Sequence, residues 1–181
     1  MKKLVLIRHC QADGNHMDSP LTNNGVNQAR RLAEFFIDQD LKIDRIISSP
    51  YMRAVETIMP YSRDKQIEIE TDVRLRERIL SAEPVDDWLD AIETSFDDMD
   101  YSLPGGESSN DALARVLELI EEIKQSDRSD TVALVTHANL LMLILAHFEG
   151  DYGFKQWRLL KKPDVFMIEH DQDFYQLHHI W

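Results

Sequence analysis

The chain has 181 residues, 43% hydrophobic and 29% charged, a balance that is ordinary for a soluble globular protein. This length can bury one core without disulfides or a metal, and the single cysteine, Cys10, excludes an internal disulfide. The formal net charge of −13, with no cluster of Lys and Arg, argues against nucleic acid as a partner.

The apolar runs are too short for a membrane segment. Lys2-Lys3 is followed by only four apolar residues before Arg8, so we expect no secretory signal peptide. The longest apolar stretch, 140–146, is far too short to span a bilayer. With one cysteine, this pattern predicts a cytoplasmic protein without membrane contact, and it leaves the oligomeric state open.

Negative charge is concentrated in one block. Residues 79–114 contain ten Asp or Glu and no Lys, Arg or His. The interpretation we favour is a solvated helix face that keeps the protein soluble. The alternative is a negative screen that excludes bulky polyanionic substrates.

In chain order, apolar and β-branched runs predict strands at 3–8, 44–48, 67–71 and 131–136, and a hairpin of 165–169 and 174–178 with its turn at 171–173. Helical spacing predicts a helix from an N-cap at Thr22 to about Asp38, and one that starts at Ser49-Pro50 with proline in its first turn. Further helices are predicted at 83–100, from a cap at Ser108 or Ser109 to about Lys124, and at 139–148.

Strands alternate with helices along most of the chain. This order predicts an α/β three-layer sandwich, with a mainly parallel central sheet, helices on both faces and an antiparallel edge. We find no repeat or interdomain linker, so residues 1–181 are interpreted as a single domain with a lid-like insertion at about 79–107.

Two predicted strands end at a histidine. Residues 4–7 lead into Arg8-His9, and residues 131–136 lead into His137. Ligands of open α/β sheets bind beyond the carboxyl ends of the strands, so these side chains are expected to share a site. A neutral imidazole is a competent nucleophile toward phosphorus, and arginine supplies a permanently charged fork for phosphoryl oxygens. Arg8, Arg53 and His137 are candidate donors to such a group.

Two further residues complete the candidate constellation. Asn15 could contact a phosphoryl oxygen, and Glu77 could protonate a leaving alkoxide. Taken singly, each of these residues is more often structural, paired with a neighbour or exposed to solvent. The functional interpretation depends on their joint occurrence at the ends of successive elements.

The motifs resemble the histidine phosphatase superfamily, also called phosphoglycerate mutase-like. The resemblance is carried, in the family's order, by 6–15 (LIRHCQADGN), 20–25 (PLTNNG), 28–29 (QA), 48–57 (SSPYMRAVET), 75–77 (LRE), 104–108 (PGGES) and 135–139 (VTHAN). It implies that His9 is transiently phosphorylated, and that Arg8, Arg53 and His137 bind the phosphate. It also implies that Glu77 is the general acid and base, and it places Asn15 at a supporting phosphate contact.

Three positions depart from the family's usual pattern. Cys10 and Ala138 stand where the family usually has Gly, and Ala12 replaces a Thr or Ser whose hydroxyl contacts phosphate. Cys10 is interpreted as a small buried space-filler rather than as a redox-sensitive thiol.

The leading hypothesis is a phosphomonoesterase that acts on small-molecule phosphate esters through a phosphohistidine, without a metal or other cofactor. Phosphoglycerate mutase-type phosphoryl transfer is the nearest alternative, and it resembles longer family members with a larger insertion and a C-terminal tail. A protein-phosphohistidine phosphatase is a variant, although compact members of that kind tend to lack a lid.

Two hypotheses come from other classes. A family member that binds phosphate with little turnover would fit Cys10 and Ala12, and the retained Arg8, His9 and Glu77 oppose it. A metallohydrolase would use His9 and His137, but no His-x-His or His-Glu-x-x-His spacing supports one. A dinucleotide-binding enzyme is disfavoured because no Gly-x-Gly-x-x-Gly follows the first strand.

Overall fold

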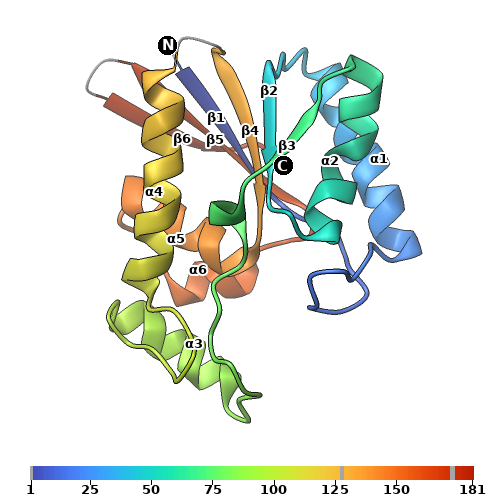
Figure 1. Cartoon of the computed structure of the whole chain (residues 1–181). Helices are drawn as coiled ribbons and strands as arrows, with labels where there is room; N and C mark the ends of the chain where they lie inside the picture. The colour runs from blue at the N-terminus through green and yellow to red at the C-terminus, as the bar shows by residue number, and fades with distance from the viewer. Residues whose placement is uncertain (1, 127–128, 172–173) are drawn as a thin grey trace.

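The computed structural model describes residues 2–126, 129–171 and 174–181 (Figure 1). Over these residues one six-stranded sheet forms, in the order β3-β2-β4-β1-β5-β6. Strands β1 to β4 are parallel, whereas β5 and β6 are antiparallel to their neighbours. The bounds are β1 Lys2–Arg8, β2 Arg45–Ser48, β3 Ile69–Thr71, β4 Thr131–Thr136, β5 Asp164–Asp171 and β6 Phe174–His179. The predicted parallel sheet with an antiparallel edge is confirmed. The predicted turn at 171–173 includes Gln172 and Asp173, which lie outside the described residues.

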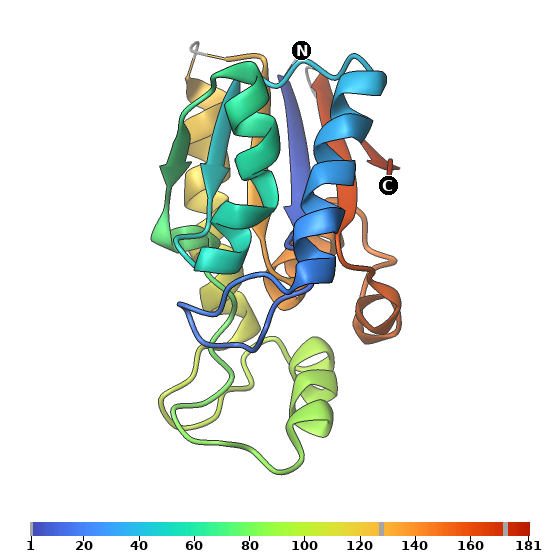
Figure 2. The same cartoon turned by 90° about the vertical axis from the view of Figure 1, so that its right-hand side faces the viewer.

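Helices cover both faces of the sheet (Figure 2). Helices α1 (Asn23–Asp38) and α2 (Met52–Lys65) pack on one face, and α4 (Ser109–Gln125) and α5 (Ala138–Phe148) pack on the other. Shorter elements are the 3-10 turn η1 (Val73–Leu75), α3 (Trp88–Asp97) and α6 (Phe154–Leu159). The three-layer prediction is therefore confirmed.

Alternation along β1 divides the core between the two faces. Leu4 and Leu6 pack in the cluster that includes α4 and α5, whereas Val5 and Ile7 pack with α1 and α2. Successive side chains of a strand point to opposite faces, so a strand covered on both sides must be apolar throughout. Each such side chain, when fully buried, stabilises the fold by roughly 1.5–3 kcal/mol.

Predicted helix starts are confirmed where a side chain caps the backbone. The Thr22 hydroxyl accepts the Gly25 N–H at 3.0 Å, at the start of α1. At α4, Ser108 accepts the Asp111 N–H at 3.0 Å, while the Asp111 carboxylate accepts the Ser108 N–H at 3.1 Å. This reciprocal capping box satisfies amides that the helix itself leaves unpaired.

Two helix predictions need correction, and one helix was missed. Helix α2 begins at Met52 after the N-cap Tyr51, so proline is not in the first turn; before it, the Ser49 N–H bonds the Val135 carbonyl of β4 at 2.8 Å. Helix α3 covers only 88–97 of the predicted 83–100. Helix α6 was not predicted, because six residues are too few to show apolar periodicity.

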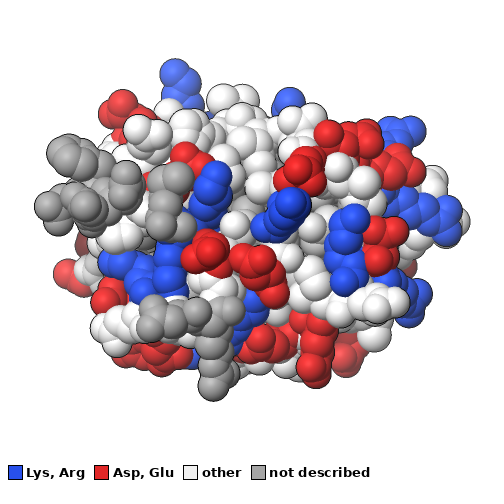
Figure 3. Space-filling model, turned by 90° about the horizontal axis from the view of Figure 1, so that it is seen from above, with Lys and Arg blue, Asp and Glu red and all other residues white. Residues whose placement is uncertain are grey.

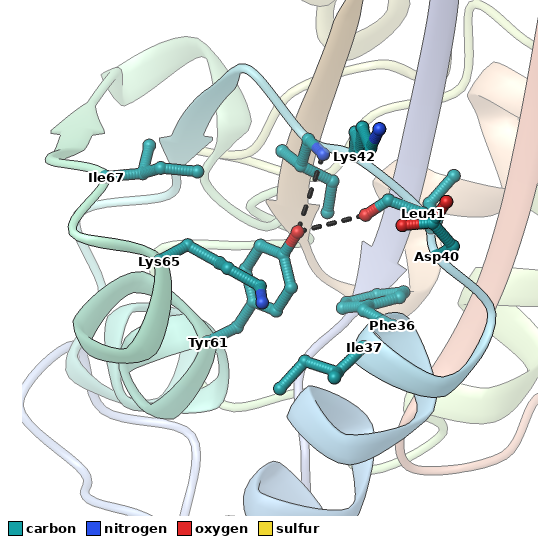
Figure 4. Close-up of a pocket in the computed structure, with 9 residues that line it drawn as sticks. Phe36, Ile37, Asp40, Leu41, Lys42, Tyr61, Lys65 and Ile67 are labelled. Carbon is teal, nitrogen blue, oxygen red and sulfur yellow. Dashed lines mark hydrogen bonds between the residues drawn. The ribbon is translucent and has the colours of Figure 1, made fainter.

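The two ends of the sheet differ. At the carboxyl ends of β1, β2 and β4, the segment that contains α3 extends below the sheet (Figure 1). The opposite end, seen from above, shows acidic and basic side chains side by side (Figure 3). There a hollow of about 350 Å³ lies between α1 and α2, and its Tyr61 hydroxyl accepts the Ile43 N–H and donates to the Leu41 carbonyl (Figure 4).

Candidate active site

The predicted site residues converge beyond the strand ends. A cavity of about 620 Å³ opens there, lined by Arg8, His9, Asn15, Arg53 and Glu77 among others. His137 lies against His9, with 5.1 Å between the ring centroids. The structure thus brings together residues from β1, the following loop, α2, the segment after η1 and the start of α5.

His9 is held in one tautomer. Its Nδ1 lies 2.7 Å from the Cys10 carbonyl oxygen, which can only accept, so Nδ1 carries the proton. Nε2 is therefore the acceptor nitrogen; it accepts the Arg53 Nε–H at 3.3 Å, and His9 and Arg53 both line the cavity. Burial lowers the pKa of His9 to about 3; the Cys10 hydrogen bond opposes this, and the charges of Arg53, Arg8 and Lys162 add to it. His9 is therefore neutral at physiological pH, as a nucleophile must be.

Backbone carbonyls position both arginines. Arg8 Nη1 donates to the carbonyls of Leu160 and Lys161 at 2.9 and 3.0 Å, and Arg53 Nη1 donates to the His16 carbonyl at 2.8 Å. The buried Nε of Arg8 has no partner within the described part of the chain. Arg8 is thus held through Nη1, and Arg53 through Nη1 and Nε, and each guanidinium keeps further N–H donors for an anion.

Glu77 joins the cavity to the start of α5. One carboxylate oxygen accepts the Asn139 N–H at 3.0 Å, and the other accepts the N–H groups of Leu140 at 3.0 Å and Arg78 at 2.9 Å. Glu77 therefore caps two amides of the first turn of α5 while it lines the cavity. Its charge also partly opposes the lowering of pKa that burial causes at the two site arginines. No pattern of residues indicated this capping role.

His137 is the N-cap residue of α5 and is 1% exposed. Its Nε2 lies 2.8 Å from the Ser49 hydroxyl, its ring contacts the Tyr51 ring, and its Nδ1 has no partner among the described residues. Burial lowers the pKa of His137 well below its ordinary value, and the charges of nearby groups, His9 and Arg53 foremost, lower it further. A neutral His137 donates a single N–H.

Tyr51, Arg78 and Lys162 also line the cavity, and sequence reasoning missed all three. Arg78 is 5% exposed and donates to the Ser95 hydroxyl at 2.7 Å. Lys162 is the next residue after Lys161, whose carbonyl accepts a hydrogen bond from Arg8. The available signals were the position of Arg78 beside Glu77, and a pair of lysines just before a strand in an acidic half of the chain.

The departures from the family pattern leave the pocket intact. Cys10 is fully buried, and burial raises its thiol pKa to about 12, although a hydrogen bond from Thr57 opposes the shift. The space-filling interpretation is therefore supported over a redox-sensitive thiol. Ala12 pairs with Leu21 in an isolated β-bridge, and Ala138 lines the cavity.

Residues 79–107 supply the far wall of the cavity, through Ile79, Leu80, Ser81, Glu83, Val85 and Trp88. Nine of the ten acidic residues within 79–114 are exposed, in agreement with a solvated face; Glu107 is the exception. A Cβ at Gly106 would meet the Leu80 carbonyl oxygen at 2.2 Å, so the turn at 104–106 packs against the chain that enters the segment.

Neither a metal site nor a membrane-spanning helix is found among the described residues. Within residues 2–126, 129–171 and 174–181, no group of three or more His, Cys, Asp or Glu is placed to hold a metal ion. None of the helices described here is both long and apolar enough to cross a membrane.

Comparisons with known proteins identify the family. A sequence profile of the histidine phosphatase superfamily (branch 1) matches residues 4–180. A Hydrogenobacter thermophilus protein named as a phosphoserine phosphatase is 30% identical over 165 residues, which cover 83% of this chain and 80% of that protein. Human 6-phosphofructo-2-kinase/fructose-2,6-bisphosphatase 4 is 28% identical over 90% of this chain, which spans only 36% of that protein.

Among solved structures, mycobacterial glucosyl-3-phosphoglycerate phosphatase in complex with inorganic phosphate superposes with a TM-score of 0.79 at 24% identity, covering 100% of this chain and 97% of the other. At this identity the superposition shows a shared fold. Together with the profile match over nearly the whole chain, these findings show that the chain belongs to branch 1 of the histidine phosphatase superfamily.

Proposed function

We propose that this protein hydrolyses small-molecule phosphate monoesters through a phosphohistidine intermediate on His9. The observation that carries the proposal is the neutral His9, whose Nδ1–H is hydrogen-bonded to a carbonyl and whose Nε2 accepts from Arg53, in a cavity that Arg8 also lines. Phosphatase or mutase-like chemistry is that of the family, and relatives named as phosphatases favour hydrolysis.

The residues would divide the reaction into two displacements. In the first, His9 Nε2 attacks phosphorus, the P–O ester bond breaks, and the protonated Glu77 carboxyl gives its proton to the departing oxygen. In the second, water attacks the phosphohistidine, Glu77 takes a proton from the water, and inorganic phosphate leaves as the N–P bond breaks. Arg8, Arg53 and the His137 N–H would stabilise charge on the non-bridging oxygens in both steps.

Trapping the intermediate tests the proposal. The protein is mixed with 4-nitrophenyl phosphate, quenched in alkaline denaturant and digested, and the peptides are weighed by mass spectrometry. We expect one phosphoryl group on the peptide that contains His9, and its loss when the peptide is acidified. His9→Asn should show neither the adduct nor turnover, whereas the matched control His16→Asn, at an exposed histidine nearby, should keep both.

Two results would contradict the proposal: a phosphoryl group on another residue, or turnover that persists in His9→Asn. Since the pKa of His9 is about 3, protonation of this residue should not slow adduct formation until the pH approaches that value. Loss of adduct formation near pH 6, at intact fold, would show that the nucleophile is not held neutral as described.

A further inference from the structure

The catalytic cavity adjoins a second one. This neighbour has a volume of about 540 Å³ and is lined by Arg8, Trp88, Leu89, Trp157, Arg158, Leu160 and Lys162. Arg8, Trp88, Trp157 and Lys162 also line the catalytic cavity, so the two spaces share a wall. Trp88 on α3 and Trp157 on α6 meet edge to face within that wall, with 6.5 Å between the ring centroids.

The second cavity is cationic in a strongly acidic protein. Its lining includes Arg8, Arg158 and Lys162 and contains no carboxylate, while the whole chain carries a net charge of −13. Arg158 and Lys162 form no ion pair within the part of the chain that the structure describes. By contrast, Arg74 and Arg115, which line neither cavity, are paired with carboxylates.

The cations follow one another outward from the nucleophile. Arg53 lines the catalytic cavity alone, Arg8 and Lys162 line both cavities, and Arg158 lines the second alone. The segment that carries Lys162 is anchored, because Arg8 binds the carbonyls just before it and the Lys161 N–H donates to Asp164 at 2.8 Å. Burial and the charges of the two site arginines lower the pKa of Lys162, a repulsion that a bound anion would relieve.

A phosphate dianion beside His9 would engage Arg8 and Arg53. The positive charges of Lys162 and Arg158 would then remain available for a second anion. Trp88, Leu89 and Leu160 supply apolar surface for the carbon chain that links two charged ends. We therefore propose that the preferred substrates carry a second anionic group, a carboxylate or a second phosphate, which Arg158 and Lys162 bind in the second cavity. This inference rests on the proposed function, because it places the reacting phosphate at His9.

Three esters with the same leaving alkoxide chain test the inference: propyl phosphate, its analogue with a terminal carboxylate, and its analogue with a terminal second phosphate. We expect the wild type to show a kcat/KM roughly five- to tenfold higher for at least one anionic analogue than for propyl phosphate, the scale of a partly exposed charge pair. The preferred analogue identifies the second anion. This ratio should fall toward one when the ionic strength is raised from about 0.05 M to about 0.5 M.

The double variant Arg158→Gln/Lys162→Gln should bring the ratio close to one. Arg31→Gln is the matched control: it removes one positive charge from an exposed site on α1 that lines neither cavity, and it should keep the wild-type ratio. A ratio near one in the wild type, or a ratio that the double variant leaves unchanged, would overturn the inference.

Binding measurements can test this inference independently of the proposed function. The same three esters are titrated by calorimetry into His9→Asn, which cannot form the covalent intermediate, with and without the double substitution. If the Kd values show the expected preference but the wild type hydrolyses none of the esters, the subsite stands and the proposed function fails. If the wild type hydrolyses all three esters without any preference in Kd or kcat/KM, the proposed function stands and the anionic subsite fails.

Discussion

The end of the candidate site that holds His9, Arg53 and His137 and the wall formed by residues 79–107 are built in opposite ways. At the buried end, His9, Arg53 and His137 are 8%, 3% and 1% exposed, and main-chain or core groups fix each of them. The facing wall has Trp88 at 51% exposure and a row of exposed acids. Under the proposed function, the buried end would carry out the reaction, and the more exposed wall would contact the organic part of the substrate.

Buried donors that are oriented before the substrate arrives cost no reorganisation during the reaction, which makes them effective in the transition state. An exposed aromatic side chain mainly contributes contact area and acts on binding. Variants at the buried end should therefore change kcat strongly, and variants on the facing wall should change KM modestly. The following experiments test that contrast in order of expected size.

Glu77→Gln should show the largest effect. It removes the transferable proton, so esters with poor alkoxide leaving groups should be hydrolysed about 10²–10⁴-fold more slowly. Aryl phosphates should still form the phosphoenzyme at nearly the native rate, measured as a pre-steady-state burst. Because the Gln amide also replaces an acceptor of N–H groups in α5, thermal unfolding must be measured in parallel. An equal loss for good and poor leaving groups would assign Glu77 to capping alone.

Arg53→Ala and Arg8→Ala should each raise the barrier in kcat/KM by about 2–4 kcal/mol, the scale for losing one positioned donor. Lysine should restore little, since it lacks the planar fork. Steady-state kinetics on one aryl phosphate measure both series, with Arg31→Ala on α1 as the control. Full rescue by lysine would show that point charge suffices and that the carbonyl contacts are incidental.

Glu107→Gln should weaken the attachment of the wall without touching the nucleophile. Glu107 accepts from Arg76 at 2.9 Å, from Arg115 at 2.8 Å and from the Ile79 N–H at 3.1 Å. Burial raises the pKa of Glu107, but these partners outweigh it and leave the pKa below the ordinary 4.5. We expect the free energy of unfolding at pH 7 to fall by about 1–3 kcal/mol in urea titrations.

The sign of the pH dependence follows from that lowered pKa. A carboxylate with a depressed pKa stabilises the fold above its unfolded value and loses this contribution as the pH falls through its folded value. The difference in free energy of unfolding between wild type and Glu107→Gln should therefore be largest at pH 7 and should shrink below about pH 4.5. A difference that stays constant to pH 3 would mean that packing, and not charge, anchors the segment.

Trp88→Ala should show the smallest effect. Trp88 is half exposed and lines both cavities, so its loss should raise KM for small esters less than about tenfold and leave kcat within about twofold. Steady-state kinetics measure both constants. A drop in kcat comparable to that of Arg53→Ala would break the contrast between the two regions.

What could be predicted from the sequence follows the same division. The strand ends at Arg8-His9 and His137 could be located because buried parallel strands are continuously apolar and stop at polar residues. The caps at Thr22 and Ser108 could be located because a side chain there replaces a missing backbone partner. These are local patterns, readable in a few consecutive residues.

What could not be predicted depends on contacts between distant segments. The carbonyls that hold Arg8 come from Leu160 and Lys161, about 150 positions away in the chain, and backbone carbonyls leave no trace in residue type. The hydrogen bonds that Glu77 accepts from the start of α5 likewise span 62 and 63 positions. The start of α2 was misplaced because the Ser49 N–H bonds the Val135 carbonyl of β4, a distant contact that outweighs the local preference of Pro50 for a first helical turn.

The buried thiol of Cys10 gives the site a chemical durability that its position would not suggest. It follows the nucleophile directly, yet with a pKa of about 12 almost none of it is thiolate near neutral pH, and only the thiolate reacts with alkylating agents or peroxide. The folded protein should therefore tolerate iodoacetamide and mild peroxide without losing its catalytic centre. The rate at which Cys10 is labelled then measures how often the core around it opens.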